Sequence, residues 1–258
     1  MAQTLPEWLN SGMDLSNRVV LITGARRIGG VLARELAAGG ADIAVSYRSS
    51  HVEADDTCAA VRAIGRRAVA ISADLADSTQ CRALVDETVR QLGRLDILVN
   101  MASHYAPAPF DTLTDAELNH GLRVDLEAAF ACSQAAVPAM RAAGGGRVIN
   151  FSDWLPVGGR PRYKGYLPYY VAKGGVIALT EALALELADD RILVNAIAPG
   201  PILAPPDLSE DERKAVEEAT PLGRWGGAQE IVKVVRFLID SDFVTGEVIR
   251  VDGGRHLR

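Results

Sequence analysis

The chain has 258 residues, a net charge of −6 and 48% hydrophobic residues, so it has enough apolar material for a large core. Nucleic-acid binders are usually basic, and we expect no nucleic-acid partner. No apolar run approaches the roughly 18 residues of a membrane helix, and the N-terminus lacks a signal-peptide pattern. The three widely spaced cysteines fit neither a disulfide framework nor a zinc site. We therefore expect a metal-free protein of a reducing compartment, the cytoplasm, with no membrane partner.

Short β-branched runs alternate with longer helical patterns along the chain. The predicted strands are Arg18–Thr23, Asp42–Tyr47, Ala68–Ala73, Leu95–Asn100, Arg147–Phe151, Leu193–Ala198 and Val248–Val251. The predicted helices span residues 29–39, 51–65, 78–92, 114–143, 168–188 and 227–240, and Thr114 is the expected N-cap of the fourth. This alternation predicts a single α/β domain with a doubly wound, Rossmann-type parallel sheet. We place it at 15–258, after an N-terminal extension at 1–14.

The stretch from Pro199 to Pro221 is the least regular part of the chain and is rich in proline and acidic residues. One interpretation is a short helix at Ser209–Ala219 that covers a site. The other is an acidic surface loop. The sequence leaves both open.

A glycine-containing turn, TGARRIGG at residues 23–30, joins the first strand to a helix. Glycines let a backbone approach a pyrophosphate, and a helix N-terminus favours an anion. An NAD site usually has Asp or Glu after the second strand, to bind the ribose 2′-hydroxyl. Here Arg48 and Ser49 follow that strand. Arg48, with Arg26 or Arg27, can pair with a 2′-phosphate, so we predict NADP(H) as the cofactor.

Tyr169 and Lys173 open the helical pattern at 168–188 and are four residues apart, so they share one helix face. A neighbouring ammonium favours the phenolate form and lowers the pKa of a tyrosine from about 10. We expect this pair to do acid–base chemistry. Tyr170 is one residue off that face, and we expect it to pack.

The order of several motifs resembles the short-chain dehydrogenase/reductase family over roughly residues 15–255. The motifs are the TGARRIG turn, Asp74 after the third strand, NMAS at 100–103, YYVAK at 169–173, Pro199-Gly200 after the sixth strand and VDGG at 251–254. The resemblance implies hydride transfer from a nicotinamide, with Tyr169 as general acid and Lys173 as its partner. It also implies a homotetramer formed through the long helices and the last strand.

The family's cofactor positions can be carried over to this sequence and joined to those of the glycine turn and Arg48. The expected cofactor residues are Gly24, Arg26, Arg27, Ile28, Gly29, Arg48, Ser49, Asp74, Leu75, Asn100, Ala102, Ser103, Tyr169, Lys173, Pro199, Gly200 and Ile202.

Three positions depart from the family pattern. The glycine turn is one residue short when it is aligned on Arg-Ile-Gly. Asp125 stands where the family commonly has an Asn that supports a proton-relay water. Asp153 stands at the family's catalytic Ser position, and Ser152 is the alternative if the register slips by one.

Asp153 makes the chain similar to the pteridine reductase branch of the family, where an Asp replaces that Ser. Arg27, Ser103 and Tyr105 also match residues of this branch. The leading prediction is therefore NADPH-dependent reduction of a C=N bond in a pterin-like or folate-like small molecule. Tyr169, Lys173 and Asp153 are the expected catalytic residues. The expected substrate residues are Arg27, Ser103, Tyr105, Asp153 and Trp154.

Other interpretations stay open. The chain could be a 3-oxoacyl-thioester or other ketone reductase, or an NADP-binding regulator without catalysis. Tyr105 could pack beside the following loop, and Trp154 could anchor a loop. The basic stretch Arg160, Arg162 and Lys164 could contact an anionic substrate tail or be a solvated loop.

Overall fold

The computed structural model describes residues 12–158 and 164–258. Most of the proposed extension at 1–14, and the basic residues Arg160 and Arg162, lie outside these ranges. Seven parallel strands form one sheet in the order β3-β2-β1-β4-β5-β6-β7. The strands are β1 (Val19–Thr23), β2 (Asp42–Tyr47), β3 (Ala68–Ser72), β4 (Ile97–Asn100), β5 (Gly146–Phe151), β6 (Ile192–Pro199) and β7 (Val248–Val251). The predicted doubly wound parallel sheet is confirmed.

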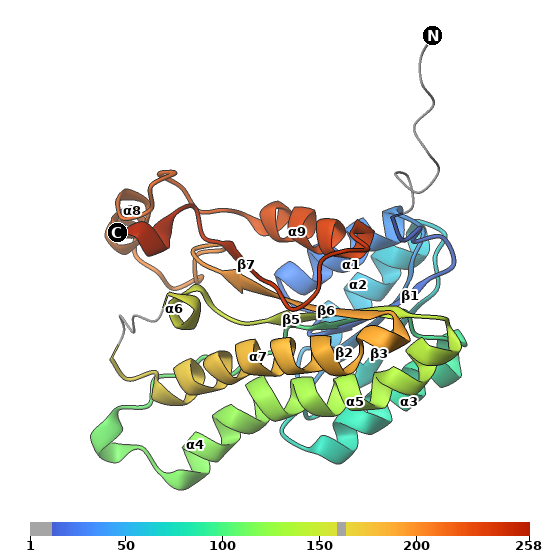
Figure 1. The fold of residues 1–258 in the computed structure, drawn as a ribbon. Coiled ribbons are helices and arrows are strands. Elements are labelled where there is room, and N and C mark those ends of the chain that lie inside the picture. Colours follow the sequence, from blue (N-terminus) through green and yellow to red (C-terminus); the bar gives the residue numbers. More distant parts are fainter. Residues whose placement is uncertain (1–11, 159–163) are drawn as a thin grey trace.

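Helices cover both faces of the sheet (Figure 1). They are α1 (Ile28–Ala38), α2 (His51–Ala63), α3 (Ser78–Leu92), α4 (Asp115–Leu122), α5 (Ala128–Ala142), α6 (Trp154–Val157), α7 (Leu167–Glu186), α8 (Glu210–Glu218) and α9 (Ala228–Asp240). Helices α1, α2 and α9 pack on one face, and α3, α5 and α7 pack on the other. All five residues of β1 are buried, as expected of a strand covered on both faces.

The site region is set by the strand order. β1 pairs with β2 on one side and with β4 on the other, so the chain winds in opposite directions from this point. The loops after β1 and β4 therefore diverge and leave a crevice at the carboxyl ends of the strands. Thr23 closes the base of this crevice, because its Oγ1 accepts hydrogen bonds from the backbone N–H groups of Met101 and Ala102, at 3.0 and 3.2 Å.

The predicted helix at 114–143 is interrupted. Thr114 is its N-cap, as expected, and forms a capping box with Glu117. Residues Arg123–Glu127 then form a π-helical turn between α4 and α5, which a hydrophobic periodicity of 3.6 residues does not reveal. Asp125 lies in this turn. The short helix α6 was not predicted, whereas the expected helix at 209–219 exists as α8.

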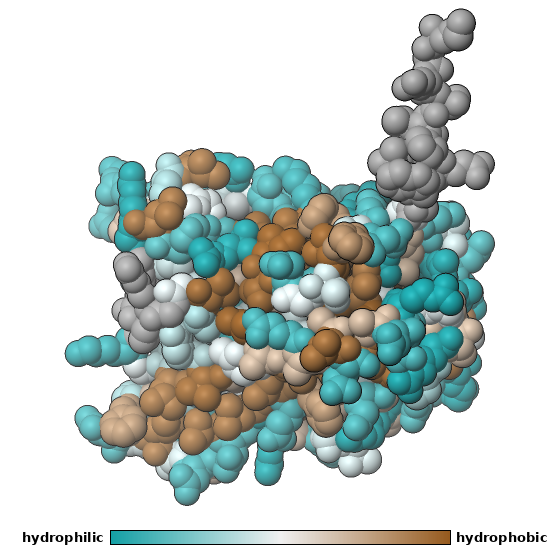
Figure 2. All heavy atoms as spheres, in the orientation of Figure 1, coloured by the Kyte–Doolittle hydropathy of each residue, from teal (hydrophilic) through white to brown (hydrophobic). Residues whose placement is uncertain are grey.

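Apolar side chains gather along α4, α5 and α7 on the lower part of the face shown in Figure 2. Phe130 on α5 and Val171 and Leu185 on α7 are exposed. Contiguous apolar surface of this kind often marks a contact between proteins. The homotetramer implied by the family resemblance uses these helices, and it stays a prediction. In the part of the chain that the structure describes, no helix combines the length and the apolar character that a membrane crossing needs.

Asp96 ties β1 to β4 at the end of the sheet opposite the crevice. Its fully buried carboxylate accepts hydrogen bonds from the Val19 N–H, from Arg18 at 2.9 Å and from Arg94 through two nitrogens.

We expect Asp96→Ala to lower the free energy of unfolding by about 2–3 kcal/mol, because it leaves buried donors without an acceptor. Urea denaturation measures this. Glu87→Ala, which breaks an exposed Arg90 pair, is the control and should change stability little. Equal effects of the two variants would contradict the argument.

Candidate active site

A cleft of about 450 Å³ opens at the carboxyl ends of β4, β5 and β6. Its wall comes from the glycine turn, the loop after β4, the start of α6, the start of α7, the loop after β6, the segment around α8 and the segment after β7. Predicted residues that line it are Arg26, Arg27, Ile28, Ser103, Tyr105, Asp153, Trp154, Tyr169, Lys173, Pro199, Gly200 and Ile202. The fold thus brings together the predicted acid–base pair and the residues expected beside the nicotinamide.

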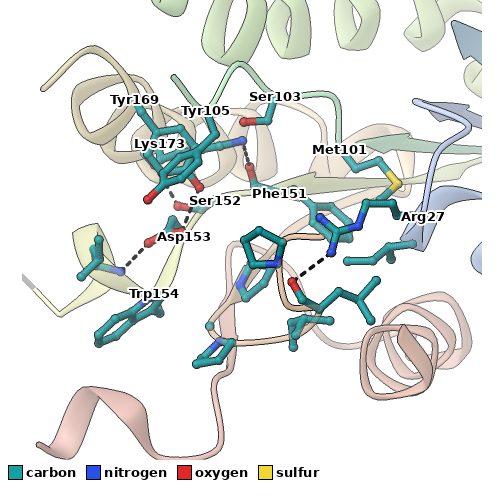
Figure 3. Close-up of a pocket in the computed structure, with 18 of the residues that line it drawn as sticks. Arg27, Met101, Ser103, Tyr105, Phe151, Ser152, Asp153, Trp154, Tyr169 and Lys173 are labelled. Atoms are coloured by element: carbon teal, nitrogen blue, oxygen red, sulfur yellow. Dashed lines mark hydrogen bonds between the residues drawn. The ribbon is translucent and has the colours of Figure 1, made fainter. Parts of the chain in front are cut away.

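Tyr169 and Asp153 form a hydrogen-bonded pair in this cleft (Figure 3). The Tyr169 hydroxyl donates to Asp153 Oδ2 at 2.9 Å. The other oxygen, Oδ1, accepts the backbone N–H of Leu155 at 2.8 Å and so caps α6. Asp153 therefore caps α6 with one oxygen and accepts a hydrogen bond from Tyr169 with the other.

Ser152, the alternative to Asp153, points elsewhere. Its Oγ donates to the backbone carbonyl of Lys173 at 2.8 Å, and the residue is 3% exposed. The side chain joins β5 to α7 and leaves the position next to the Tyr169 hydroxyl to Asp153.

Lys173 is buried and held from two sides. Its ammonium donates to the carbonyl of Phe151 at 2.8 Å and lies 3.0 Å from Asp125 Oδ1. The Lys173 and Asp125 side chains are 3% and 0% exposed, so this ion pair is shielded from water. The second oxygen of Asp125 accepts the backbone N–H of His104 at 2.9 Å. Asp125 thus connects the π-helical turn, the loop after β4 and the catalytic helix.

The expected lowering of the Tyr169 pKa is wrong. Burial, with added repulsion from Asp153 and Asp125, raises the pKa of Tyr169 well above its usual value of about 10. Burial is the largest cause of the raised pKa of Tyr169, and the phenol also faces the Asp153 carboxylate. Burial also raises the pKa of Asp153, against the lowering effects of the Leu155 N–H, Tyr169 and Lys173. The phenol is therefore protonated in the resting site.

Tyr105 packs against other tyrosines at the mouth of the cleft. Its ring stacks on Tyr166 with centroids 4.5 Å apart and meets the Tyr169 ring edge-on at 4.8 Å. More than half of its surface is exposed. Tyr105 therefore presents an aromatic surface beside the Tyr169 hydroxyl.

The sequence analysis missed several residues of the cleft wall. They are Met101, Leu155, Pro201, Leu203, Pro205, Val216, Trp225 and Arg255. Arg255 lies above the buried Trp154 ring, 5.9 Å from its centroid. Most of these residues come from loops and from α8, where hydrophobic periodicity carries no signal. The interpretation of 199–221 as a cover for a site agrees with this lining.

A smaller pocket of about 180 Å³ adjoins the crevice on the β2 side. The predicted cofactor residues that line it are Gly24, Arg48, Ser49, Asp74, Leu75, Ala102 and Ser103. The glycine turn between the two pockets is tightly packed, because a Cβ at Gly29 would lie 2.0 Å from the Gly24 carbonyl oxygen. The two pockets and this cradle suit a dinucleotide, whose adenosine would lie near Arg48 and whose nicotinamide would lie near Tyr169.

Asn100 and Arg27, which are also predicted cofactor residues, are held by protein contacts. Asn100 lies below the cleft, where its Nδ2 donates to Asn150 Oδ1 at 2.9 Å. Arg27 has a φ of 50°, and its Nη2 donates to the carbonyls of Leu203 and Ala204 at 3.0 and 2.7 Å. Figure 3 shows Arg27 beside Met101, apart from the Tyr169 group. Arg27 therefore links the glycine turn to the loop after β6.

Two histidines near the cleft, His104 and His256, are half-buried. The His104 ring packs edge-on against His120, with centroids 4.7 Å apart, and His256 Nδ1 lies 2.7 Å from Asp252 Oδ2. Within residues 12–158 and 164–258, no group of three or more His, Cys, Asp or Glu side chains is arranged to hold a metal ion.

Known proteins resemble the chain over almost its whole length. Residues 23–256 match the sequence profile of the family described as Enoyl-(Acyl carrier protein) reductase. The 3-oxoacyl-(acyl-carrier-protein) reductase FabG of Staphylococcus aureus is 35% identical over 242 residues, which are 92% of this chain and 97% of that protein.

Solved structures agree. A short-chain dehydrogenase/reductase from Serratia marcescens superposes with a TM-score of 0.87 at 30% identity, covering 95% of this chain and all of that chain. A blue fluorescent protein from a metagenomic library, solved in complex with NADPH, superposes with a TM-score of 0.86 at 35% identity. The match covers 94% of this chain and 99% of that chain. With this fold, these relatives and Tyr169 and Lys173 in one cleft, the chain belongs to the short-chain dehydrogenase/reductase family of oxidoreductases.

Proposed function

We propose that the protein reduces a carbonyl group with NADPH. The observation that carries the proposal is that Lys173 Nζ lies 5.7 Å from the centroid of the Tyr169 ring, in a cleft that Pro199, Gly200 and Ile202 also line. The similarity to FabG supports a ketone, including a 3-oxoacyl thioester, more than it supports the pterin substrate predicted from Asp153.

NADPH supplies a hydride when it is bound. The residues of this chain handle the proton. Tyr169 is protonated in the resting site, so it is ready to donate to the oxygen of a carbonyl that is being reduced. That oxygen takes the place of Asp153 Oδ2 as acceptor of the Tyr169 hydrogen bond. Solvent then returns a proton to the phenolate, and the Tyr169 hydroxyl donates to Asp153 Oδ2 again.

NADP(H), rather than NAD(H), is the cofactor that the smaller pocket favours. Arg48 and Ser49 line this pocket beside Tyr47 and Ser50, and its one carboxylate, Asp74, belongs to the loop after β3. At the β2 end the pocket thus offers a guanidinium and hydroxyls, which suit a 2′-phosphate. Ser49, Asp74 and Leu75 would contact the adenosine.

A pterin-like ring is the second candidate. Asp153 bonded to Tyr169 can deliver a proton to a ring nitrogen, and Tyr105 offers an aromatic surface 4.8 Å from the Tyr169 ring. A plain ketone has no use for a second acid. A regulator without catalysis is disfavoured, because Tyr169 and Lys173 line the same cleft.

The test is a substrate panel with purified enzyme, followed by NADPH absorbance. The panel contains acetoacetyl thioester, simple ketones, dihydrobiopterin and dihydrofolate. We expect ketone or thioester turnover in the wild type. Tyr169→Phe should lower kcat by about 10²–10⁴-fold, because the proton donor is lost. Tyr170→Phe, one residue along the same helix, is the matched control and should stay close to wild type.

Each other outcome of the panel decides between candidates. Pterin turnover without ketone turnover, lost in Asp153→Ser, would replace the main proposal by the second candidate. NADPH binding without oxidation of any panel member would favour the regulator.

Cofactor choice gives a further prediction. Arg48→Gln should raise the Kd for NADPH about tenfold or more and leave the Kd for NADH nearly unchanged, because only NADPH carries the 2′-phosphate. Fluorescence titration of the reduced cofactors measures both constants. Arg82→Gln, an exposed arginine on α3 that bonds to Gln134, is the control. If wild-type protein binds NADH as tightly as NADPH, the assignment is wrong.

A further inference from the structure

The cleft contains more positive than negative charge. Among the described residues that line it, Arg26, Arg27, Lys173 and Arg255 are basic, and Asp153 is the one acid. This imbalance is local, because the whole chain has a net charge of −6.

Two of these basic groups have carboxylate partners outside the cleft lining. Lys173 pairs with Asp125, and Arg26 lies 3.5 Å from Glu53. Arg27 and Arg255 form no ion pair within the part of the chain that the structure describes. Arg27 belongs to the glycine turn, on the cofactor side of the cleft. Arg255 is therefore the uncompensated charge on the substrate side.

Arg255 is held in place with most of its donors unused. Its Nη1 donates to the carbonyl of Ala219 at 2.7 Å, and its guanidinium lies above the Trp154 ring. Nε is buried without a hydrogen-bond partner. A guanidinium has five N–H donors, and this one uses a single donor towards the described residues. It is thus positioned to bind an acceptor that the protein does not supply.

Arg255 and the Tyr169–Asp153 pair line the same cleft. Trp154 directly follows Asp153, and Asp153 accepts the Tyr169 hydroxyl at 2.9 Å. The residue whose ring the Arg255 guanidinium contacts is thus the chain neighbour of the carboxylate that accepts from the proton donor. A substrate whose carbonyl contacts Tyr169 has room, in a cleft of about 450 Å³, for a second group a few bonds away.

We propose that Arg255 binds a carboxylate carried by the substrate a few bonds from its reducible carbonyl. A carboxylate presents two coplanar oxygens, which match the guanidinium fork, and its charge offsets the unpaired arginine. This inference rests on the proposed carbonyl reduction and narrows it to oxo acids. The segment after β7, which carries Arg255, would then be part of the substrate site.

Binding without turnover tests the inference separately from the reaction. Isothermal titration calorimetry on the NADP⁺-loaded enzyme compares pentanoate with pentanamide, which has nearly the same shape and no charge. Wild type should prefer pentanoate. Arg255→Gln should raise the Kd of pentanoate about 10- to 100-fold and leave pentanamide unchanged.

Arg258→Gln is the matched control. Arg258 also donates to a backbone carbonyl at the end of α8, that of Glu218, but it does not line the cleft. It should keep the wild-type preference. If both variants lower the melting temperature equally and change the Kd values of pentanoate and pentanamide equally, Arg255 only anchors the C-terminal segment. That result would overturn the inference.

Kinetics with 4-oxopentanoate and 4-oxopentanamide complete the test. In Arg255→Gln we expect a higher KM for the acid with little change in kcat. Turnover of both substrates without preference in the wild type would overturn the inference and leave carbonyl reduction standing. Pentanoate binding that depends on Arg255, without turnover of any ketone, would overturn carbonyl reduction and leave the carboxylate site standing.

A separate observation concerns Asp125. One carboxylate holds Lys173 at 3.0 Å and the His104 backbone N–H at 2.9 Å, and Asp125 is 3% exposed. His104 directly precedes Tyr105, whose ring contacts Tyr169. The same side chain therefore reaches the catalytic lysine and the loop that carries the aromatic wall.

We infer that Asp125 is a positioning residue that fixes Lys173 and the Tyr105 loop against the catalytic helix. An Asn here would keep an acceptor for the His104 N–H and remove the charge. The charged or titratable groups facing Tyr169 would then be Asp153, Lys173 and Tyr105, with Lys173 unbalanced.

The test is the pH dependence of kcat for reduction, in which Tyr169 must be protonated. The rate falls as pH rises through the pKa of Tyr169, which Asp125 helps to raise. In Asp125→Asn we expect the alkaline limb to move to lower pH. An unchanged limb would overturn the inference.

A thermal-unfolding cycle with Asp125→Asn, Lys173→Gln and the double variant supplies a readout that needs no activity. Coupling between the two single variants is the expected result. Additive losses of stability would also contradict the pairing role.

Discussion

The arrangement of the site depends on a buried ammonium and the carboxylate that balances it. Lys173 cannot be buried as a cation without an opposite charge, and Asp125 provides that charge at 3.0 Å. The position of Asp125 requires the π-helical turn between α4 and α5, and the position of Lys173 requires the start of α7 to lie against β5. The rest of the acid–base site is ordered around this pair.

The contacts of Asp125 and Asp153 explain how the site accommodates two carboxylates at positions where the family commonly has Asn and Ser. Asp125 offsets the charge of Lys173, and Asp153 accepts a hydrogen bond from the Tyr169 hydroxyl. Each of the two carboxylates therefore has a partner. The two negative charges nevertheless act together on the phenol and favour its neutral form. A neutral phenol is the proton-donating form that the proposed reduction requires of Tyr169.

The strands and most helices could be predicted because a covered parallel sheet leaves continuous apolar runs, and helices such as α3 have clear caps. Tyr169 and Lys173 were predictable because a helix fixes their spacing. The ion pair of Asp125 with Lys173 was not, since 48 positions separate the two residues and a π-helical turn breaks the expected period. The place of Arg255 in the cleft depends on how the chain after β7 folds back, for which the sequence offered no pattern.

Asp153 illustrates a limit of family comparison. The sequence aligned it with a catalytic serine and led to a pterin substrate, whereas the relatives found by comparison point to ketones. In the structure Asp153 has two roles. It caps α6, and it accepts a hydrogen bond from the Tyr169 hydroxyl. A residue with a structural role and a chemical role is a weak guide to the substrate.

The contact of Arg27 with the loop after β6 couples two binding events. Its Nη2 donates to the carbonyls of Leu203 and Ala204, and Leu203 is part of the cleft wall. A phosphate group that draws Arg27 away would release that wall. By thermodynamic linkage, any substrate that fits the released wall better would in turn tighten the dinucleotide. The affinity of each ligand would then depend on the occupancy of the other.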